Sequence, residues 1–221
     1  MIKKNKILIL NWKMQPSSLE SALKKAKEIS SLSKRYKIEI YLASPAIYAL
    51  EIKKKFKNIK VGLQNIYFEK SGAFTGEISP LMISKNKLDF ALIGHSERRV
   101  YFKENYKVFL KKIKACQSSK VKVIFCFESL KEIKKIKNKK GIIFAYEPRK
   151  YISSFGGKII EKEKLKKIVE NFRKILPQEK ILYGGSLSPE NVKELNFVDG
   201  FLIGIKSINP KFVRKIIENL N

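Results

Sequence analysis

Eight short apolar runs recur along the chain, and a longer amphipathic stretch follows each of them. The runs are continuous in apolar residues and do not alternate with polar ones, which is typical of strands buried on both faces of a parallel sheet. This recurrence limits the chain to folds built from strand-then-helix units. The predicted strands are Ile7–Leu10, Ile38–Leu42, Lys60–Leu63, Phe90–Ile93, Val121–Phe125, Ile142–Ala145, Ile181–Tyr183 and Gly200–Ile203.

The stretches between the runs have the period of amphipathic helices. Apolar residues fall on one face, as at Leu165, Val169 and Phe172. Several stretches also begin with a capping signal. A capping residue stands before a first-turn proline at Ser44-Pro45, Ser79-Pro80, Ser188-Pro189 and Asn209-Pro210, and Ser17 with Glu20 has the spacing of a capping box.

Eight such units follow one another without a linker or a low-complexity segment. We therefore predict a single domain over residues 1–221, an α/β fold in which eight parallel strands close into a (β/α)8 barrel with the helices outside. An open doubly wound sheet is the alternative. That fold usually carries a glycine-rich nucleotide loop after its first strand, and here the position reads Asn11-Trp12-Lys13.

The charge of the chain is unusual. The 48 basic residues against 20 acidic ones give a net charge of +28, which suggests an anionic partner such as nucleic acid. However, 42 of the basic residues are lysines and 6 are arginines, and arginine is the preferred fork for phosphates and bases. Since the lysines are also spread along the chain, we expect no specific nucleic-acid partner, although steering of small anionic substrates is compatible with this charge.

Other sequence features exclude several classes of protein. Cys116 and Cys126 form no C-x-x-C motif, so neither a zinc site nor a disulfide framework is predicted. The apolar run at Ile7–Leu10 is too short for a signal peptide, and no run is long enough to span a bilayer. We expect a cytoplasmic protein with reduced thiols and no membrane partner.

In a barrel of this kind the active site lies at the C-terminal ends of the strands. Polar residues and glycines follow the predicted strands at this end: Asn11, Lys13, Gln64, Asn65, His95, Glu97, Glu147, Gly184, Gly185, Ser186 and Gly204. The chain's one histidine is among them, although a lone histidine is more often a packed residue. A carboxylate, a lysine, a histidine and glycine-rich final loops suit proton transfer on a small phosphorylated molecule.

Other chemistries fit this set of residues less well. His95 and Ser96 are adjacent in sequence and cannot both aim at one atom, which disfavours a nucleophilic triad. One histidine and no H-E-x-x-H motif disfavour metal catalysis. We predict no metal and no cofactor.

The chain resembles the triosephosphate isomerases. The motifs that carry the resemblance span most of the chain in order: Asn11-Trp12-Lys13-Met14, Gln64-Asn65, Ser71-Gly72-Ala73-Phe74-Thr75-Gly76-Glu77, Gly94-His95-Ser96-Glu97-Arg98-Arg99, Ala145-Tyr146-Glu147-Pro148 and Tyr183-Gly184-Gly185-Ser186. The resemblance implies a TIM barrel that interconverts dihydroxyacetone phosphate and glyceraldehyde 3-phosphate in glycolysis and gluconeogenesis.

The resemblance also implies roles for individual residues. Glu147 would be the base, and His95 would polarise the carbonyl oxygens as a neutral donor. Lys13 would place a positive charge near the enediolate and the phosphate, with Asn11 shaping the site. The remaining assignments are Glu97 as a partner of Lys13, Ser153, Ser186, Gly204 and Ile205 as substrate-binding positions, and Thr75 as the tip of a loop that docks into a second subunit of a homodimer.

Two of these positions keep a structural alternative. Glu97 could instead form a salt bridge with Arg98, and Ser186 could cap the next turn. A catalytically impaired barrel that only binds phosphate ligands or nucleic acid is the alternative for the whole chain.

Three departures from the family pattern stand out. The loop from Arg149 to Gly157, which closes as a lid in this family, lacks the family's tryptophan and is about two residues longer. Ile205 and Lys206 follow Gly204, where the family has small residues. The segment after Cys126 is short, so we predict a reduced fifth helix over about Leu130–Lys137.

Overall fold

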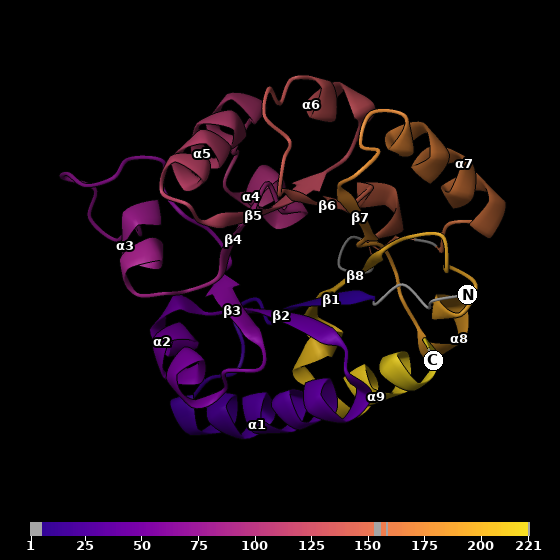
Figure 1. Ribbon diagram of the computed structural model, residues 1–221, viewed down its shortest axis with the longest axis horizontal. Coiled ribbons are helices and arrows are strands. Elements are labelled where there is room, and N and C mark those ends of the chain that lie inside the picture. The colour runs from indigo at the N-terminus through magenta and orange to yellow at the C-terminus, as the bar shows by residue number, and fades with distance from the viewer. Residues whose placement is uncertain (1–5, 153–155, 158, 221) are drawn as a thin grey trace.

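The computed structural model describes residues 6–152, 156–157 and 159–220. Its strands form one closed barrel in which each strand pairs in parallel with the next and β8 pairs with β1 (Figure 1). The predicted (β/α)8 fold is therefore confirmed, and the open sheet is excluded. The strands are β1 (Ile7–Asn11), β2 (Glu39–Ser44), β3 (Lys60–Leu63), β4 (Phe90–Ile93), β5 (Lys122–Phe127), β6 (Ile143–Tyr146), β7 (Lys180–Tyr183) and β8 (Gly200–Ile203).

The barrel is filled by side chains from alternate strand positions, because successive residues of a strand point to opposite faces. This interior cluster comprises Ile7, Ile9, Tyr41, Ala43, Phe90, Leu92, Ile124, Cys126, Ile143, Ala145, Leu182 and Leu202. The intervening residues face outward and pack with the helices in a larger cluster. Both faces of every strand are thus buried, which explains why the sequence shows continuous apolar runs.

The helices surround the barrel as a ring (Figure 1). They are α1 (Leu19–Tyr36), α2 (Ala46–Lys55), α3 (Pro80–Lys85), α4 (Ser96–Tyr101), α5 (Tyr106–Ser118), α6 (Leu130–Lys134), α7 (Lys162–Arg173), α8 (Pro189–Val192) and α9 (Pro210–Glu218), with short 3₁₀ turns η1 (Arg149–Tyr151) and η3 (Ile205–Ile208). The segment between β3 and α3 projects from the ring (Figure 1). Among the described residues, no helix combines the length and the apolar character that crossing a membrane requires.

Three of the predicted caps are confirmed and two are wrong. Ser79, Ser188 and Asn209 each accept a hydrogen bond from a first-turn backbone N–H. The cap of α1 is Ser18, one residue after the predicted Ser17. Ser44 still belongs to β2, and its hydroxyl donates to the carbonyl of Pro45, so that it caps no helix.

The reduced fifth helix of the sequence prediction corresponds to α6, which spans Leu130–Lys134. It begins where predicted and ends three residues earlier than Lys137. Ile133 and Ile136 are nevertheless buried, so even this short segment covers its side of the barrel. The shortening affects the outer ring and leaves β5 and β6 paired over four residues.

Candidate active site

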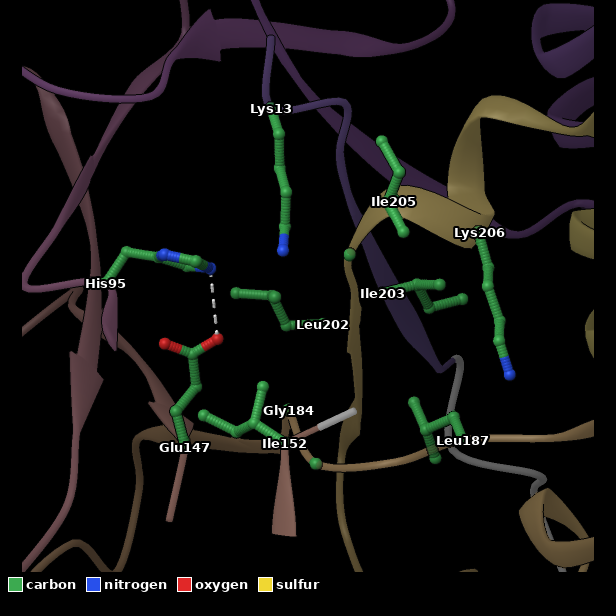
Figure 2. A pocket seen from close by; sticks show the side chains of 12 residues that line it. Lys13, His95, Glu147, Ile152, Gly184, Leu187, Leu202, Ile203, Ile205 and Lys206 are labelled. Carbon is green, nitrogen blue, oxygen red and sulfur yellow. Dashed lines mark ion pairs between the residues drawn. The ribbon is translucent and has the colours of Figure 1, made fainter. Parts of the chain in front are cut away.

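One cavity of about 200 Å³ lies at the C-terminal mouth of the barrel (Figure 2). Its walls come from residues that follow β1, β4, β6, β7 and β8, so that segments distant in sequence meet here. It is lined by Lys13, His95, Glu147, Ile152, Gly184, Gly185, Leu187, Leu202, Ile203, Gly204, Ile205 and Lys206. The cavity therefore combines a carboxylate, an imidazole and two ammonium groups with apolar walls.

His95 is held by the start of the helix that follows β4. It is the N-cap of α4, and its Nδ1 accepts a hydrogen bond from the backbone N–H of Glu97 at 3.3 Å. A nitrogen that accepts a hydrogen bond must carry a lone pair, which in the neutral ring leaves the proton on Nε2. Nε2 points toward Glu147, 3.4 Å from its Oε1 (Figure 2). The imidazole can thus donate a hydrogen bond from Nε2 into the cavity.

Glu147 directly follows β6 and is 2% exposed. Its Oε2 accepts a hydrogen bond from the backbone N–H of Ser96 at 3.3 Å. A Cβ atom at Gly184 would lie 2.8 Å from its Cγ, so only glycine leaves room for the carboxylate at this place. Ile152 and Leu202 lie beside it (Figure 2) and exclude water from this end of the cavity.

The charge of Glu147 acts on the barrel interior beneath it. Burial, followed by interaction with Glu147, raises the pKa of the Cys126 thiol well above its ordinary value. Cys126 is therefore a protonated, packed side chain at neutral pH, as expected for a thiol in an apolar interior. Both cysteines are buried and free.

Lys13 has a left-handed backbone conformation, with a φ of 54°, which is uncommon for a residue other than glycine. Its N–H donates to Oδ1 of Asn11 at 3.0 Å, and its carbonyl accepts from Nε2 of Gln64 at 2.8 Å. Its Nζ lies 2.5 Å from Oε1 of Glu97. The structure thus brings Lys13 and Glu97 together, while Arg98 pairs with Glu104.

Ser186 lies next to the cavity, but its donors point elsewhere. Its N–H donates to the carbonyl of Tyr151 at 2.7 Å, and its hydroxyl donates to the same carbonyl at 3.0 Å. Ser186 therefore joins the loop after β7 to the η1 turn after β6. A role for Ser186 in phosphate binding stays a prediction. It requires Ser186 to exchange its hydrogen bonds to Tyr151 for hydrogen bonds to the phosphate.

The other predicted positions lie as follows. Gly204 and Ile205 line the cavity, and Ile205 is half-exposed. Asn11 is buried, does not line the cavity, and accepts a hydrogen bond from the backbone N–H of Lys13, which does. Thr75 lies within the exposed segment between β3 and α3. Ser153 lies outside the described residues.

Sequence reasoning missed several residues of the cavity. Ile152, Leu187, Leu202 and Ile203 supply its apolar wall, and Lys206 supplies a second ammonium group. Leu202 and Ile203 end a predicted strand, which signals proximity to the mouth of the barrel. Lys206 carries no such signal, because it is one of 42 lysines.

A parallel eight-stranded barrel with a carboxylate, a donor histidine and a lysine at its C-terminal mouth is the architecture of a TIM-barrel enzyme. Comparison with known proteins makes this specific. The family model described as triosephosphate isomerase matches residues 6–220. The chain belongs to the triosephosphate isomerase family.

Individual relatives support the same assignment. The chain is 34% identical to a triosephosphate isomerase of Coprinopsis cinerea, over 92% of this chain and 93% of the relative. It is 33% identical to a triosephosphate isomerase of Clostridium tetani, over 96% of this chain and 95% of the relative. It is 34% identical to a triosephosphate isomerase of Thermodesulfovibrio yellowstonii, over 96% of this chain and 98% of the relative. The similarity therefore covers the whole barrel.

Proposed function

We propose that this chain interconverts dihydroxyacetone phosphate and D-glyceraldehyde 3-phosphate through an enediolate, in glycolysis and gluconeogenesis. The observation that carries the proposal is the meeting of Glu147, His95 and Lys13 at one cavity in a chain of this family. The reaction needs a base, a donor for the carbonyl oxygen and a positive charge. It needs no metal and no cofactor.

Glu147 is the proposed base. It removes a proton from the hydroxyl-bearing carbon beside the carbonyl group and returns it to the former carbonyl carbon. A proton also moves from the hydroxyl oxygen to the former carbonyl oxygen, so that the carbonyl group moves by one position. A carboxylate that water cannot reach suits this step, because general bases act best when they are positioned and shielded. Ile152, Leu202 and the burial of the carboxylate support this role.

His95 is the proposed donor to the substrate oxygens. The Nε2–H tautomer, which the hydrogen bond from Glu97 N–H favours, supports this role. A donor already aimed at a developing negative oxygen stabilises the enediolate without reorganising in the transition state.

Lys13 is proposed to supply the positive charge for the enediolate and the phosphate. Asn11 positions Lys13 through its backbone, and Glu97 positions the ammonium group through the ion pair. Ser153, Ser186, Gly204 and Ile205 are the proposed substrate-binding positions around the phosphate. Their support is the resemblance to the family and, for Gly204 and Ile205, their place in the cavity wall.

We further propose a cytoplasmic homodimer, each subunit being one domain over residues 1–221, in which Thr75 docks into the partner subunit. The support is the segment between β3 and α3: it projects from the barrel (Figure 1), residues 69–77 are exposed, and Phe74 is 41% exposed at its tip. An exposed aromatic side chain on a projecting loop is typical of a protein interface.

Replacing Glu147 by Gln tests the proposed chemistry. We expect kcat to fall by about 10²–10⁴, the scale of general base catalysis, because the amide cannot accept the proton. A coupled assay of glyceraldehyde 3-phosphate conversion measures it. The matched control is Glu170→Gln, because Glu170 is an exposed carboxylate on α7. This variant should keep the parental rate. Parental turnover in Glu147→Gln would exclude Glu147 as the base.

A further inference from the structure

We propose that Lys206 is a second cationic substrate-binding residue, which binds the phosphate of the triose phosphate at the side of the cavity away from Glu147 and His95. The inference rests on the proposed function, since it concerns the same substrate. It assigns a role to a lysine that stands where the family has a small residue.

Lys206 lies at the end of the cavity opposite His95 and Glu147 (Figure 2). It is the second residue of η3, directly beyond β8, and it lines the cavity together with Lys13. Its side chain runs beside Ile203 toward Leu187, on the opposite side from His95 and Glu147 (Figure 2). A substrate whose carbon atoms meet His95 and Glu147 would therefore extend its phosphate toward Lys206.

The charges around the cavity show why a second cation is needed. Lys13 and Glu147 carry opposite charges and cancel, and Glu97 also lies 2.5 Å from the ammonium group of Lys13. A phosphate monoester carries nearly two negative charges at neutral pH. Among the residues that line the cavity, Lys206 therefore supplies the positive charge that Glu147 does not balance.

The charge of Lys206 is available to a ligand. Among the described residues, the ammonium group of Lys206 forms no ion pair within 4 Å of a carboxylate. Its charge is felt by Glu190, whose pKa is lowered first by a hydrogen bond with Ser188 and in smaller part by the charges of Lys215 and Lys206. The ammonium group lies 5.6 Å from the centroid of the Phe212 ring, which is within cation–π range. A lysine has a long flexible stem, so that a small rotation brings the ammonium group onto a bound phosphate.

Both donors of Ser186 and the backbone N–H of Ser207, in the same corner, are already engaged. The N–H and hydroxyl of Ser186 both donate to the carbonyl of Tyr151. The N–H of Ser207 donates to the carbonyl of Gly204 at 2.8 Å. Because these groups are paired within the protein, a phosphate gains more from the unpaired cation at Lys206 than from them.

The experiment compares Lys206→Gln, Lys206→Arg and Lys166→Gln with the parent. Lys166→Gln removes the same charge from the exposed face of α7 and is the matched control for bulk electrostatics. For each protein we would measure the dissociation constant of inorganic phosphate by phosphorus NMR, KM and kcat for glyceraldehyde 3-phosphate, and kcat/KM for D-glyceraldehyde, which has no phosphate.

We expect Lys206→Gln to raise the phosphate dissociation constant and KM by about fivefold or more, the scale of losing one charge-assisted hydrogen bond. kcat should change less, Lys206→Arg should restore binding, and Lys166→Gln should resemble the parent. Activity toward D-glyceraldehyde should be unchanged, a result that a merely structural role for Lys206 would not give.

Three outcomes would overturn the inference: unchanged phosphate binding in Lys206→Gln, an equal loss in Lys166→Gln, or an equal loss of activity toward D-glyceraldehyde. Phosphate binding is measured without turnover. A parent that binds phosphate through Lys206 but converts no triose phosphate would therefore refute the proposed function and leave this inference standing.

Discussion

At the scale of the residue, Lys13 shows how the fold fixes a side chain that its own preferences would not. Its left-handed φ of 54° costs free energy in a residue with a Cβ atom. Hydrogen bonds from Gln64 and to Asn11, together with the ion pair to Glu97, offset that cost. The ammonium group is therefore aimed into the cavity by contacts from β1, β3 and α4.

Replacing Gln64 by Ala should weaken this support. We expect kcat/KM to fall by about tenfold, because a small misplacement of a charged group near the reacting atoms is costly. Steady-state kinetics measures the change, and thermal unfolding checks that the barrel is intact.

Gln117 offers a matched control, since its amide donates to the carbonyl of Asn138 on the outer surface. Gln117→Ala removes the same kind of hydrogen bond far from the cavity and should leave kcat/KM unchanged. Equal effects in the two variants would show that Gln64 does not position Lys13.

At the scale of the element, the segment after β6 shows how this chain holds a loop that lacks the family's tryptophan. The η1 turn is closed by hydrogen bonds from Tyr151 N–H to Pro148 and from Ile152 N–H to Arg149. Arg149 also forms an ion pair with Glu128, the residue after β5, through Nε at 2.8 Å and Nη2 at 3.2 Å. The geometry suggests that this pair fixes where the loop leaves the barrel.

Replacing Arg149 by Met should lower kcat/KM by about three- to tenfold, because Ile152 loses its fixed place beside Glu147. Stability should change by less than about 1 kcal/mol, as expected for an exposed ion pair. Enzyme kinetics and thermal unfolding measure the two effects.

The pair Arg214–Glu218 on α9 is the control, because its Nε–Oε1 distance is also 2.8 Å and its arginine is 52% exposed against 54% for Arg149. Arg214→Met should therefore change stability as little as Arg149→Met does, but it should leave kcat/KM unchanged. A parental kcat/KM in Arg149→Met would contradict a positioning role for the pair.

At the scale of the whole molecule, the net charge of +28 surrounds a cavity whose substrate is an anion. Many of the acidic side chains are already engaged in ion pairs, among them Asp89, Glu104, Glu132 and Asp199. Because 48 basic residues outnumber 20 acidic ones, most lysines have no carboxylate of their own to balance their charge. Such a surface attracts anions over a distance of about one Debye length.

This field predicts that kcat/KM for glyceraldehyde 3-phosphate falls several-fold as sodium chloride rises from about 20 mM to about 300 mM, because salt screens the attraction. The conversion of uncharged D-glyceraldehyde should not respond, which controls for effects of salt on the protein itself. Equal salt dependence for the two substrates would contradict steering by the surface charge.

Much of the fold could be predicted from the sequence, because the period of apolar residues and the capping signals are local. All eight strands lie within two residues of their predicted bounds. The errors at Ser17 and Ser44 concern element ends, where neighbouring residues compete for the same cap. Lys13, His95 and Glu147 could be assigned to the cavity because the barrel has one functional end.

The order of the elements and the barrel fold follow from short-range periodicity in the sequence, and the residues after each strand show which chemical groups lie at its mouth. Which of these groups touch depends on the folded chain. Lys13 meets Glu97, 84 positions away, Ser186 donates to the carbonyl of Tyr151, and Lys206, one of 42 lysines, joins Lys13 in the lining of the cavity. The reason is that closing the barrel joins positions whose separation along the chain carries no periodic signal, and side-chain packing then selects among them.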